Sequence, residues 1–211
     1  MTPNNTLIAD TGTKRYLALG DSYTIGQSVA TTDRFPAQTV AQLRTKGIHM
    51  HDPEYIATTG WTTSNLLNAL HTQNPQGPYD VVSLLIGVND QYQTHDTTNY
   101  RSRFTQLLTQ AIVLAGNRTA RVFVVSIPDY SATPFVATSN KAQVSKELDW
   151  FNNINKQVAL QYHIVYIDIT PSSREAATNT ALIASDSLHP SGLEYKKWAD
   201  LLSAKMMEVL K

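Results

Sequence analysis

The sequence predicts a single α/β domain in which a five-stranded parallel sheet is covered by helices on both faces. Short runs of β-branched and other apolar residues alternate with longer segments of helical periodicity. The strongest runs are apolar at nearly every position, which is typical of parallel strands buried on both faces. Strands that alternate with helices through right-handed crossovers imply a three-layer α/β/α sandwich.

Each expected strand is a short apolar segment that ends in small or polar residues. Two of these segments, 81–86 and 121–127, contain the nearly continuous apolar runs and are expected to be buried on both faces. The five expected strands are residues 16–19, 55–57, 81–86, 121–127 and 164–167.

The expected helices lie at 36–46, 63–71, 100–116 and about 141–162. In segment 100–116 the apolar residues recur every three or four positions, as a stripe facing a core requires, and Gly116 ends the pattern. A last helix is expected to begin after Ser191, which would form a capping box with Glu194. Its apolar stripe consists of Trp198, Leu201, Leu202, Met206 and Val209.

Bulk properties exclude several classes of protein. The 211 residues suit one domain, expected at 14–211 after a polar tail at 1–13. With 17 basic and 17 acidic residues and no local basic run, a nucleic-acid partner is not expected. The absence of cysteine excludes disulfides, thiolate metal sites and cysteine nucleophiles. We expect no transmembrane segment, and a cytoplasmic protein or an exported one without its signal.

Ser22 is the first candidate for chemistry. It follows the strand at 16–19 within Gly20-Asp21-Ser22-Tyr23, which places its hydroxyl at the carboxyl edge of the sheet. A serine there could equally cap the following helix. The motif is not the Gly-x-Ser-x-Gly elbow, because Thr24 occupies the position of the second glycine.

Two further segments follow expected strands. Gly60 comes after the strand at 55–57, where a glycine permits an unusual backbone angle and close approach to a ligand, or simply a turn. Asn89 follows the strand at 81–86, in Gly87-Val88-Asn89-Asp90. Its side-chain amide is a neutral donor suited to an oxyanion, although Asn and Asp are also common turn formers.

Asp186 and His189 precede the last helix, separated by three positions. Within one tight turn this spacing lets Asp186 accept from one ring nitrogen and leaves the other free to take a proton from a hydroxyl. The other histidines have no comparable local partner and are interpreted as surface or satisfied residues: His49, His51, His71, His95 and His163. One serine, one glycine, one asparagine and one Asp/His pair together supply the parts that acyl transfer needs.

These blocks resemble, in order and spacing, those of the SGNH superfamily of GDSL-type esterases and lipases, over most of the chain from about residue 16. The resemblance implies a flavodoxin-like sheet and a catalytic site without metal or other cofactor. It also implies that Ser22 is the nucleophile, His189 the base and Asp186 its orienting acid. The backbone N–H groups of Ser22 and Gly60 and the Asn89 amide would form the oxyanion hole. Tyr23 departs from the leucine of the family's name.

The substrate pocket is expected from residues in or near the loops that follow the strands. A small acyl group and a sugar ring suit such a pocket equally well, and a short-chain ester is preferred, so the expected partner is a small-molecule or glycan ester. The candidate pocket residues are Asp21, Trp61, Tyr92, Tyr130, Phe135 and Leu188.

Other functions stay open at this stage. The same kind of sheet hosts flavin- or phosphate-binding modules, with the segment after residue 19 as a phosphate loop, and a catalytically silent scaffold is a further alternative. Among enzymes, a carbohydrate O-deacetylase, a thioesterase and a lysophospholipase are not distinguished, and the oligomeric state is left open.

Overall fold

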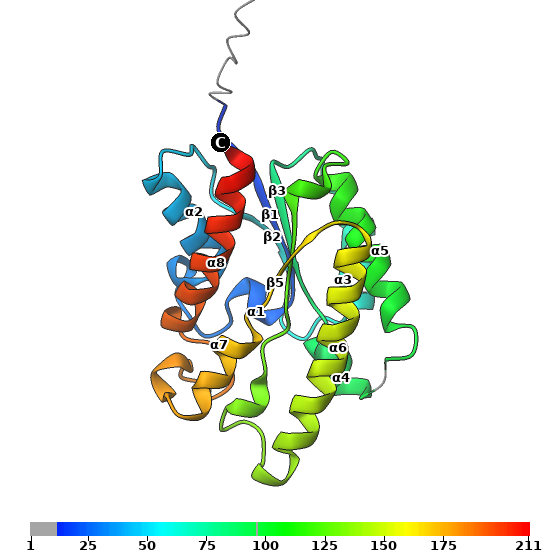
Figure 1. The fold of residues 1–211 in the computed structure, drawn as a ribbon, viewed down its shortest axis with the longest axis vertical. Helices are drawn as coiled ribbons and strands as arrows, with labels where there is room; N and C mark the ends of the chain where they lie inside the picture. The colour runs from blue at the N-terminus through cyan, green and yellow to red at the C-terminus, as the bar shows by residue number, and fades with distance from the viewer. Residues whose placement is uncertain (1–11, 96) are drawn as a thin grey trace, which may run out of the picture.

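The computed structural model describes residues 12–95 and 97–211, so most of the expected tail at 1–13 lies outside the described residues. Five parallel strands form one sheet in the order β2-β1-β3-β4-β5 (Figure 1). The strands are β1 (Tyr16–Gly20), β2 (Glu54–Ala57), β3 (Val81–Leu85), β4 (Val122–Val125) and β5 (Val165–Ile167). All five expected strands are present, which confirms the predicted sheet.

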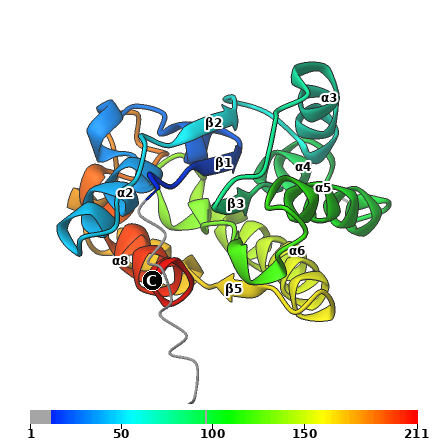
Figure 2. The same ribbon diagram turned by 90° about the horizontal axis from the view of Figure 1, so that it is seen from above.

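Helices cover both faces of this sheet, as the view from above shows (Figure 2). One layer contains α2 and α8, and the other contains α3, α5 and α6. The helices are α1 (Ser22–Ile25), α2 (Phe35–Thr45), α3 (Thr63–Gln73), α4 (Val88–Thr94), α5 (Tyr100–Leu114), α6 (Lys141–Gln161), α7 (Thr170–Arg174) and α8 (Gly192–Leu210). The three-layer α/β/α sandwich predicted from the alternating pattern is therefore confirmed.

Burial follows position in the sheet. Every residue of the three inner strands β1, β3 and β4 is buried, whereas the edge strands β2 and β5 keep partly exposed residues. This difference explains why the inner strands are the continuous apolar runs in the sequence.

The capping box expected at the start of α8 is wrong. Ser191 occupies the N-cap, but its hydroxyl donates to the carbonyl oxygen of Ala181 at 2.7 Å. Glu194 is buried, and its carboxylate accepts from Ser172 at 2.7 Å and from Trp198 at 2.8 Å. The Glu194 carboxylate therefore binds side chains of α7 and α8 and is not available for the capping box with Ser191.

The segment after β3, expected as a loop, instead forms the short helix α4. Gly87 turns the chain between them with a φ of 127°, and a Cβ at this position would collide with the Tyr100 hydroxyl. That hydroxyl shares its hydrogen between the Ile86 carbonyl at 3.2 Å and Asn155 Oδ1 at 2.9 Å, so the aromatic ring of α5 fixes the turn. Only glycine satisfies both the angle and the space. As a result α4 begins directly at the carboxyl edge of the sheet.

Candidate active site

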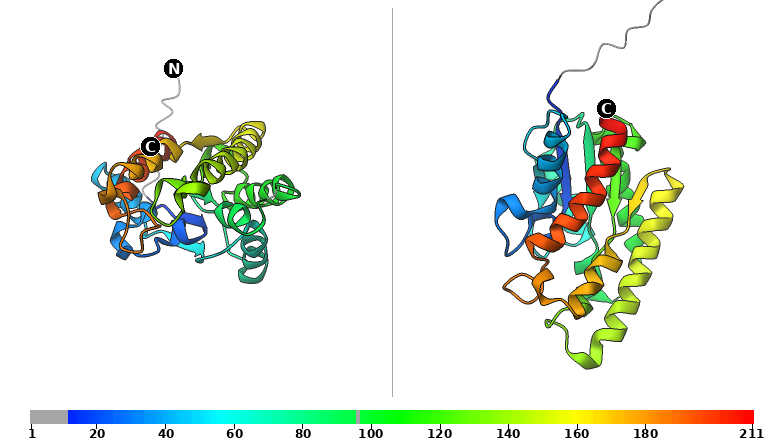
Figure 3. Two further views of the ribbon diagram at one scale, coloured as in Figure 1. Left: turned by 90° about the horizontal axis from the view of Figure 1, so that it is seen from below. Right: turned by 60° about the vertical axis from the view of Figure 1, so that its left-hand side comes forward.

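The carboxyl ends of the parallel strands meet at one end of the molecule, shown from below in Figure 3 (left). Ser22 lies there as the first residue of α1, immediately after β1. At the neighbouring Gly20 a Cβ would overlap both the Thr24 side chain and the Leu85 carbonyl. The chain therefore passes from strand to helix in a tight turn that brings the serine hydroxyl to the surface of a pocket.

Asp21 stabilises this turn. It does not line the pocket, in contrast to the expectation from sequence. Its side chain is fully buried and accepts a hydrogen bond from the Tyr23 N–H at 3.0 Å. Burial, with a contribution from the nearby charge of Asp90, raises the pKa of Asp21 to about 8. The Asp21 carboxyl thus caps α1 from within the protein instead of contacting a ligand.

Asp186 and His189 meet in one turn before α8. Asp186 Oδ1 accepts from the backbone N–H groups of Leu188 and His189 at 3.0 and 2.9 Å. Its Oδ2 lies 2.6 Å from His189 Nδ1. The carboxylate therefore orients the imidazole, and the other ring nitrogen, Nε2, is left for a second partner. His189 and Ser22 line the same pocket.

Ser28 completes this pair and was not anticipated from sequence. Its hydroxyl donates to Asp186 Oδ2 at 2.6 Å across a separation of 158 residues. Ser28 has a φ of 66°, which is uncommon for a non-glycine residue. Burial raises the pKa of Asp186, but hydrogen bonds from Ser28 and His189 outweigh it and hold this pKa well below its usual range. Nothing in the local sequence around Ser28 marks this contact.

Gly60, in the turn after β2, and Asn89, in α4, line the same pocket. Gly60 has a φ of 83°, and nothing lies within 4 Å of a Cβ built there, so its side of the pocket is open to a ligand. Asn89 Nδ2 donates to the Trp61 carbonyl at 3.0 Å, which uses one of its two hydrogens and fixes the amide. Gln93 donates to the Gly60 carbonyl at 3.3 Å and ties this peptide to α4.

Asp90, the residue after Asn89, connects α4 to α3. Its buried carboxylate accepts from the Thr63 N–H at 2.8 Å and from the Thr63 hydroxyl at 2.6 Å. Arg103 lies 3.3 Å away and neutralises the charge. The carboxylate therefore fixes the start of α3 relative to Asn89, and with it the Gly60 turn.

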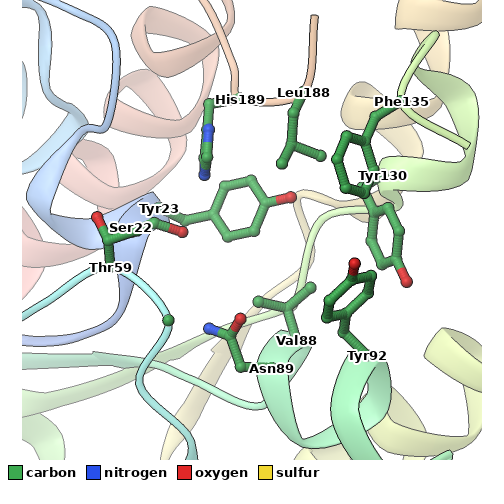
Figure 4. A pocket seen from close by; sticks show the side chains of 11 residues that line it. Ser22, Tyr23, Thr59, Val88, Asn89, Tyr92, Tyr130, Phe135, Leu188 and His189 are labelled. Carbon is green, nitrogen blue, oxygen red and sulfur yellow. The ribbon is translucent and has the colours of Figure 1, made fainter. Parts of the chain in front are cut away.

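One pocket of about 150 Å³ unites these groups (Figure 4). His189 and Asn89 project into it from opposite sides of Ser22. Trp61, expected in the pocket, instead packs half-buried against the core. The lining consists of Ser22, Tyr23, Thr59, Gly60, Val88, Asn89, Tyr92, Tyr130, Phe135, Leu188 and His189. It includes four of the six pocket residues expected from sequence, together with Tyr23, Thr59 and Val88, which were not anticipated.

An aromatic wall, defined as Tyr92, Tyr130 and Phe135, closes the side of the pocket farthest from Ser22. Their ring centroids lie 6.2 to 6.3 Å apart in each pair. The Tyr130 hydroxyl, in η3 (Tyr130–Ala132), donates to Gln91 at 2.8 Å and so points away from the pocket. The wall therefore presents chiefly apolar ring surface.

Within residues 12–95 and 97–211, no group of three or more His, Asp or Glu side chains is arranged to hold a metal ion. None of the described helices is long and apolar enough to cross a membrane.

Residues 18–197 match the model of the GDSL-like Lipase/Acylhydrolase family. None of the curated proteins matches the chain in sequence. Among solved structures, a member of the lipolytic G-D-S-L family from Veillonella parvula is 19% identical, with a TM-score of 0.67 over 92% of this chain and 97% of that chain. The acetylxylan esterase Axe2 from Geobacillus stearothermophilus is 18% identical, with a TM-score of 0.69 over 92% and 95%. Phospholipase A1 from Streptomyces albidoflavus is also 18% identical, with a TM-score of 0.69 over 92% and 100%. These similarities show a shared fold.

Proposed function

The chain belongs to the GDSL-like lipase/acylhydrolase family of hydrolases, and from that premise we propose that it is a serine esterase with Ser22 as nucleophile. His189 is the general base, and Asp186 orients it. The observation that carries this proposal is the single pocket lined by Ser22, His189, Gly60 and Asn89. A flavin- or phosphate-binding role is not favoured, because it assigns no task to the Asp186–His189 pair or to Asn89.

The proposed reaction begins when His189 Nε2 removes the proton of the Ser22 hydroxyl as its oxygen attacks the ester carbonyl. The tetrahedral intermediate collapses to an acyl-enzyme, and the protonated imidazole gives its proton to the departing alcohol. Water, activated by the same imidazole, then releases the acid and restores Ser22. The 2.6 Å contact with Asp186 supports this role because it holds the ring in one orientation throughout.

The negative oxygen of the intermediate would be held by the N–H groups of Ser22 and Gly60 and by the Asn89 amide. The amide N–H of the first helical residue, Ser22, has no acceptor within α1. The amide of Asn89 is fixed by the Trp61 carbonyl, so its free hydrogen needs no reorganisation when charge develops. Preorganised donors of this kind stabilise the transition state more than the bound ester.

A short acyl group is the substrate that the pocket size favours. About 150 Å³ holds a ligand about the size of benzene, and the pockets of drug-sized ligands begin at roughly 300 Å³. The similar structures include both an acetylxylan esterase, whose name specifies a short acyl group, and a phospholipase A1. The aromatic wall limits the length of the pocket, so we favour the short chain.

The test compares hydrolysis of p-nitrophenyl acetate, butyrate and octanoate by the wild type and by Ser22→Ala. We expect turnover in the wild type, a rate that is highest for acetate or butyrate, and a loss of at least about 10³-fold in the variant. Circular dichroism checks that the variant is folded. Full activity of folded Ser22→Ala would refute the nucleophile, and a maximum at octanoate would refute the short-chain preference.

A further inference from the structure

Tyr23, the residue next to the proposed nucleophile, occupies the middle of the pocket. Its ring lies between Ser22 and Leu188, and its hydroxyl points toward Leu188 and the aromatic wall (Figure 4). The side chain is only 3% exposed, and its ring centroid lies 5.3 Å from that of His189. A smaller pocket shares Tyr23, Leu188 and His189 with the first. The phenol therefore stands where the two cavities adjoin.

The Tyr23 hydroxyl differs from those of the buried Tyr16 and Tyr100 because no described residue forms a hydrogen bond with it. The hydroxyl of Tyr16 pairs with Ser83 at 2.7 Å, and that of Tyr100 donates to Asn155 at 2.9 Å. A buried phenol normally finds a partner, since leaving it unpaired costs free energy. Tyr195 also lacks a partner, but it does not line the pocket.

The surroundings of Tyr23 keep its hydroxyl protonated, and no described residue offers it a hydrogen bond. Burial raises the pKa of Tyr23 well above its usual value, and the charges of Asp21 and Asp186 add to this effect. Across the pocket it faces Leu188 and the aromatic wall, whose Tyr92 hydroxyl also points toward the pocket. An available donor in a chiefly apolar pocket is how binding sites select a ligand with one matching oxygen.

We propose that Tyr23 determines specificity by donating a hydrogen bond to an oxygen that the substrate carries beyond its scissile carbonyl. This proposal rests on the proposed esterase function and deepens it. The favoured substrates are short esters with a hydroxyl, ether or carbonyl oxygen, such as hydroxyacyl or sugar esters, over plain alkyl esters of the same length. The oxygen belongs to the acyl or to the alcohol portion, and the experiment below distinguishes them.

The test uses two pairs of esters in which one methylene is replaced by oxygen. p-Nitrophenyl methoxyacetate and butyrate vary the acyl portion, and 2-methoxyethyl acetate and butyl acetate vary the alcohol portion. For each pair the ratio of kcat/KM, ether over alkyl, is measured in the wild type and in Tyr23→Phe. Comparing the ratios between proteins cancels the different intrinsic reactivities of the esters. We expect the ratio for one pair to fall about tenfold in Tyr23→Phe, as the loss of one hydrogen bond implies.

Tyr195→Phe is the matched control, because it removes an unpartnered phenol that does not line the pocket, and it should leave both ratios unchanged. Equal ratios in wild type and folded Tyr23→Phe would overturn the proposal. A second measurement needs no variant: the wild-type ratio divided by the ratio for hydroxide-catalysed hydrolysis should exceed about ten for one pair, and a value near one for both would also overturn it.

Ser22→Ala separates this proposal from the underlying function. Hydrolysis that depends on Ser22 but shows unchanged ratios in Tyr23→Phe refutes only the role of Tyr23. Hydrolysis that does not depend on Ser22 refutes the proposed esterase mechanism and the Tyr23 proposal together.

Discussion

The described part of the molecule contains two histidine–carboxylate pairs with similar contacts and different surroundings. His189 Nδ1 lies 2.6 Å from Asp186, and His95 Nδ1 lies 2.8 Å from Glu147. In the first pair the imidazole is enclosed, with 9% of its side chain exposed, and in the second it is 57% exposed. Glu147 is the buried member of its pair, whereas Asp186 is the more exposed member of the other.

The surroundings decide what each pair can do. His189 shares a pocket with Ser22, Gly60 and Asn89. Glu147 is surrounded by amides instead, since it accepts from Gln91 at 2.7 Å and from Gln143 at 2.6 Å. Gln91 in turn binds the Tyr130 hydroxyl, so the second pair braces the aromatic wall. A carboxylate-oriented imidazole is therefore insufficient for acyl transfer, which also needs a nucleophile and oxyanion donors within reach.

The largest expected effect tests this difference directly. Removing the imidazole in His189→Ala should lower kcat by roughly 10⁴–10⁶-fold, because the proposed nucleophile loses its base. His95→Ala should stay within about twofold of the wild type, because Gln91 and Gln143 still hold Glu147. Both variants are compared by kcat on p-nitrophenyl acetate. Comparable losses in the two variants would contradict the division of roles.

Asn89→Ala tests the proposed oxyanion donor, which lines the pocket of His189 and has no counterpart beside Glu147 among the described residues. The expected cost is about 10²–10³ in kcat, with KM little changed, because the amide acts on charge that develops only in the transition state. Asn89→Asp is an informative companion, since it keeps the shape but replaces the donor by a negative charge and should be at least as damaging. Activity close to wild type in folded Asn89→Ala would remove Asn89 from the proposed site.

Ser28→Gly probes the hydrogen bond that distinguishes Asp186 from Glu147. We expect kcat to fall about tenfold with KM unchanged, since a charge-assisted hydrogen bond that orients the base is lost. Glycine also relieves the positive φ, so the thermal midpoint should not fall. A variant with lower stability and unchanged kcat would indicate a purely structural role for Ser28.

Glu147→Gln gives the smallest effect, and it appears in stability instead of rate. Burial raises the pKa of Glu147, but hydrogen bonds from His95, Gln143 and Gln91 outweigh it and lower this pKa below the usual value. A carboxylate with a lowered pKa in the folded state stabilises the protein above its unfolded pKa, and this contribution is lost as the pH falls. The stability difference between wild type and variant should therefore shrink from about pH 5 downward, measured by urea unfolding. A difference independent of pH would contradict this account.

Local patterns in the sequence were sufficient for the fold and for the motifs of the site. Hydrophobic patterning identified all five strands, most clearly the inner ones, because strands buried on both faces need apolar residues at nearly every position. Ser22, Gly60 and Asn89 were selected because each follows a strand, and parallel strands bring their carboxyl ends to one edge. Asp186 and His189 were recognisable because three residues separate them within one turn.

Contacts between distant segments were decided only by the tertiary structure. Ser28 reaches Asp186 across 158 positions, and His95 reaches Glu147 across 52, so no local pattern encodes either pair. Asp21 and Trp61 likewise lie outside the pocket because their side chains pack against the core. Glu194 does not cap α8, because its carboxylate binds Ser172 in α7 and Trp198 in α8. The sequence by itself determined which segments form strands and helices and which polar residues follow them, because these properties depend on neighbours along the chain. Tertiary packing decided which side chains contact one another, because a buried polar group must form a hydrogen bond with a partner that the fold places next to it.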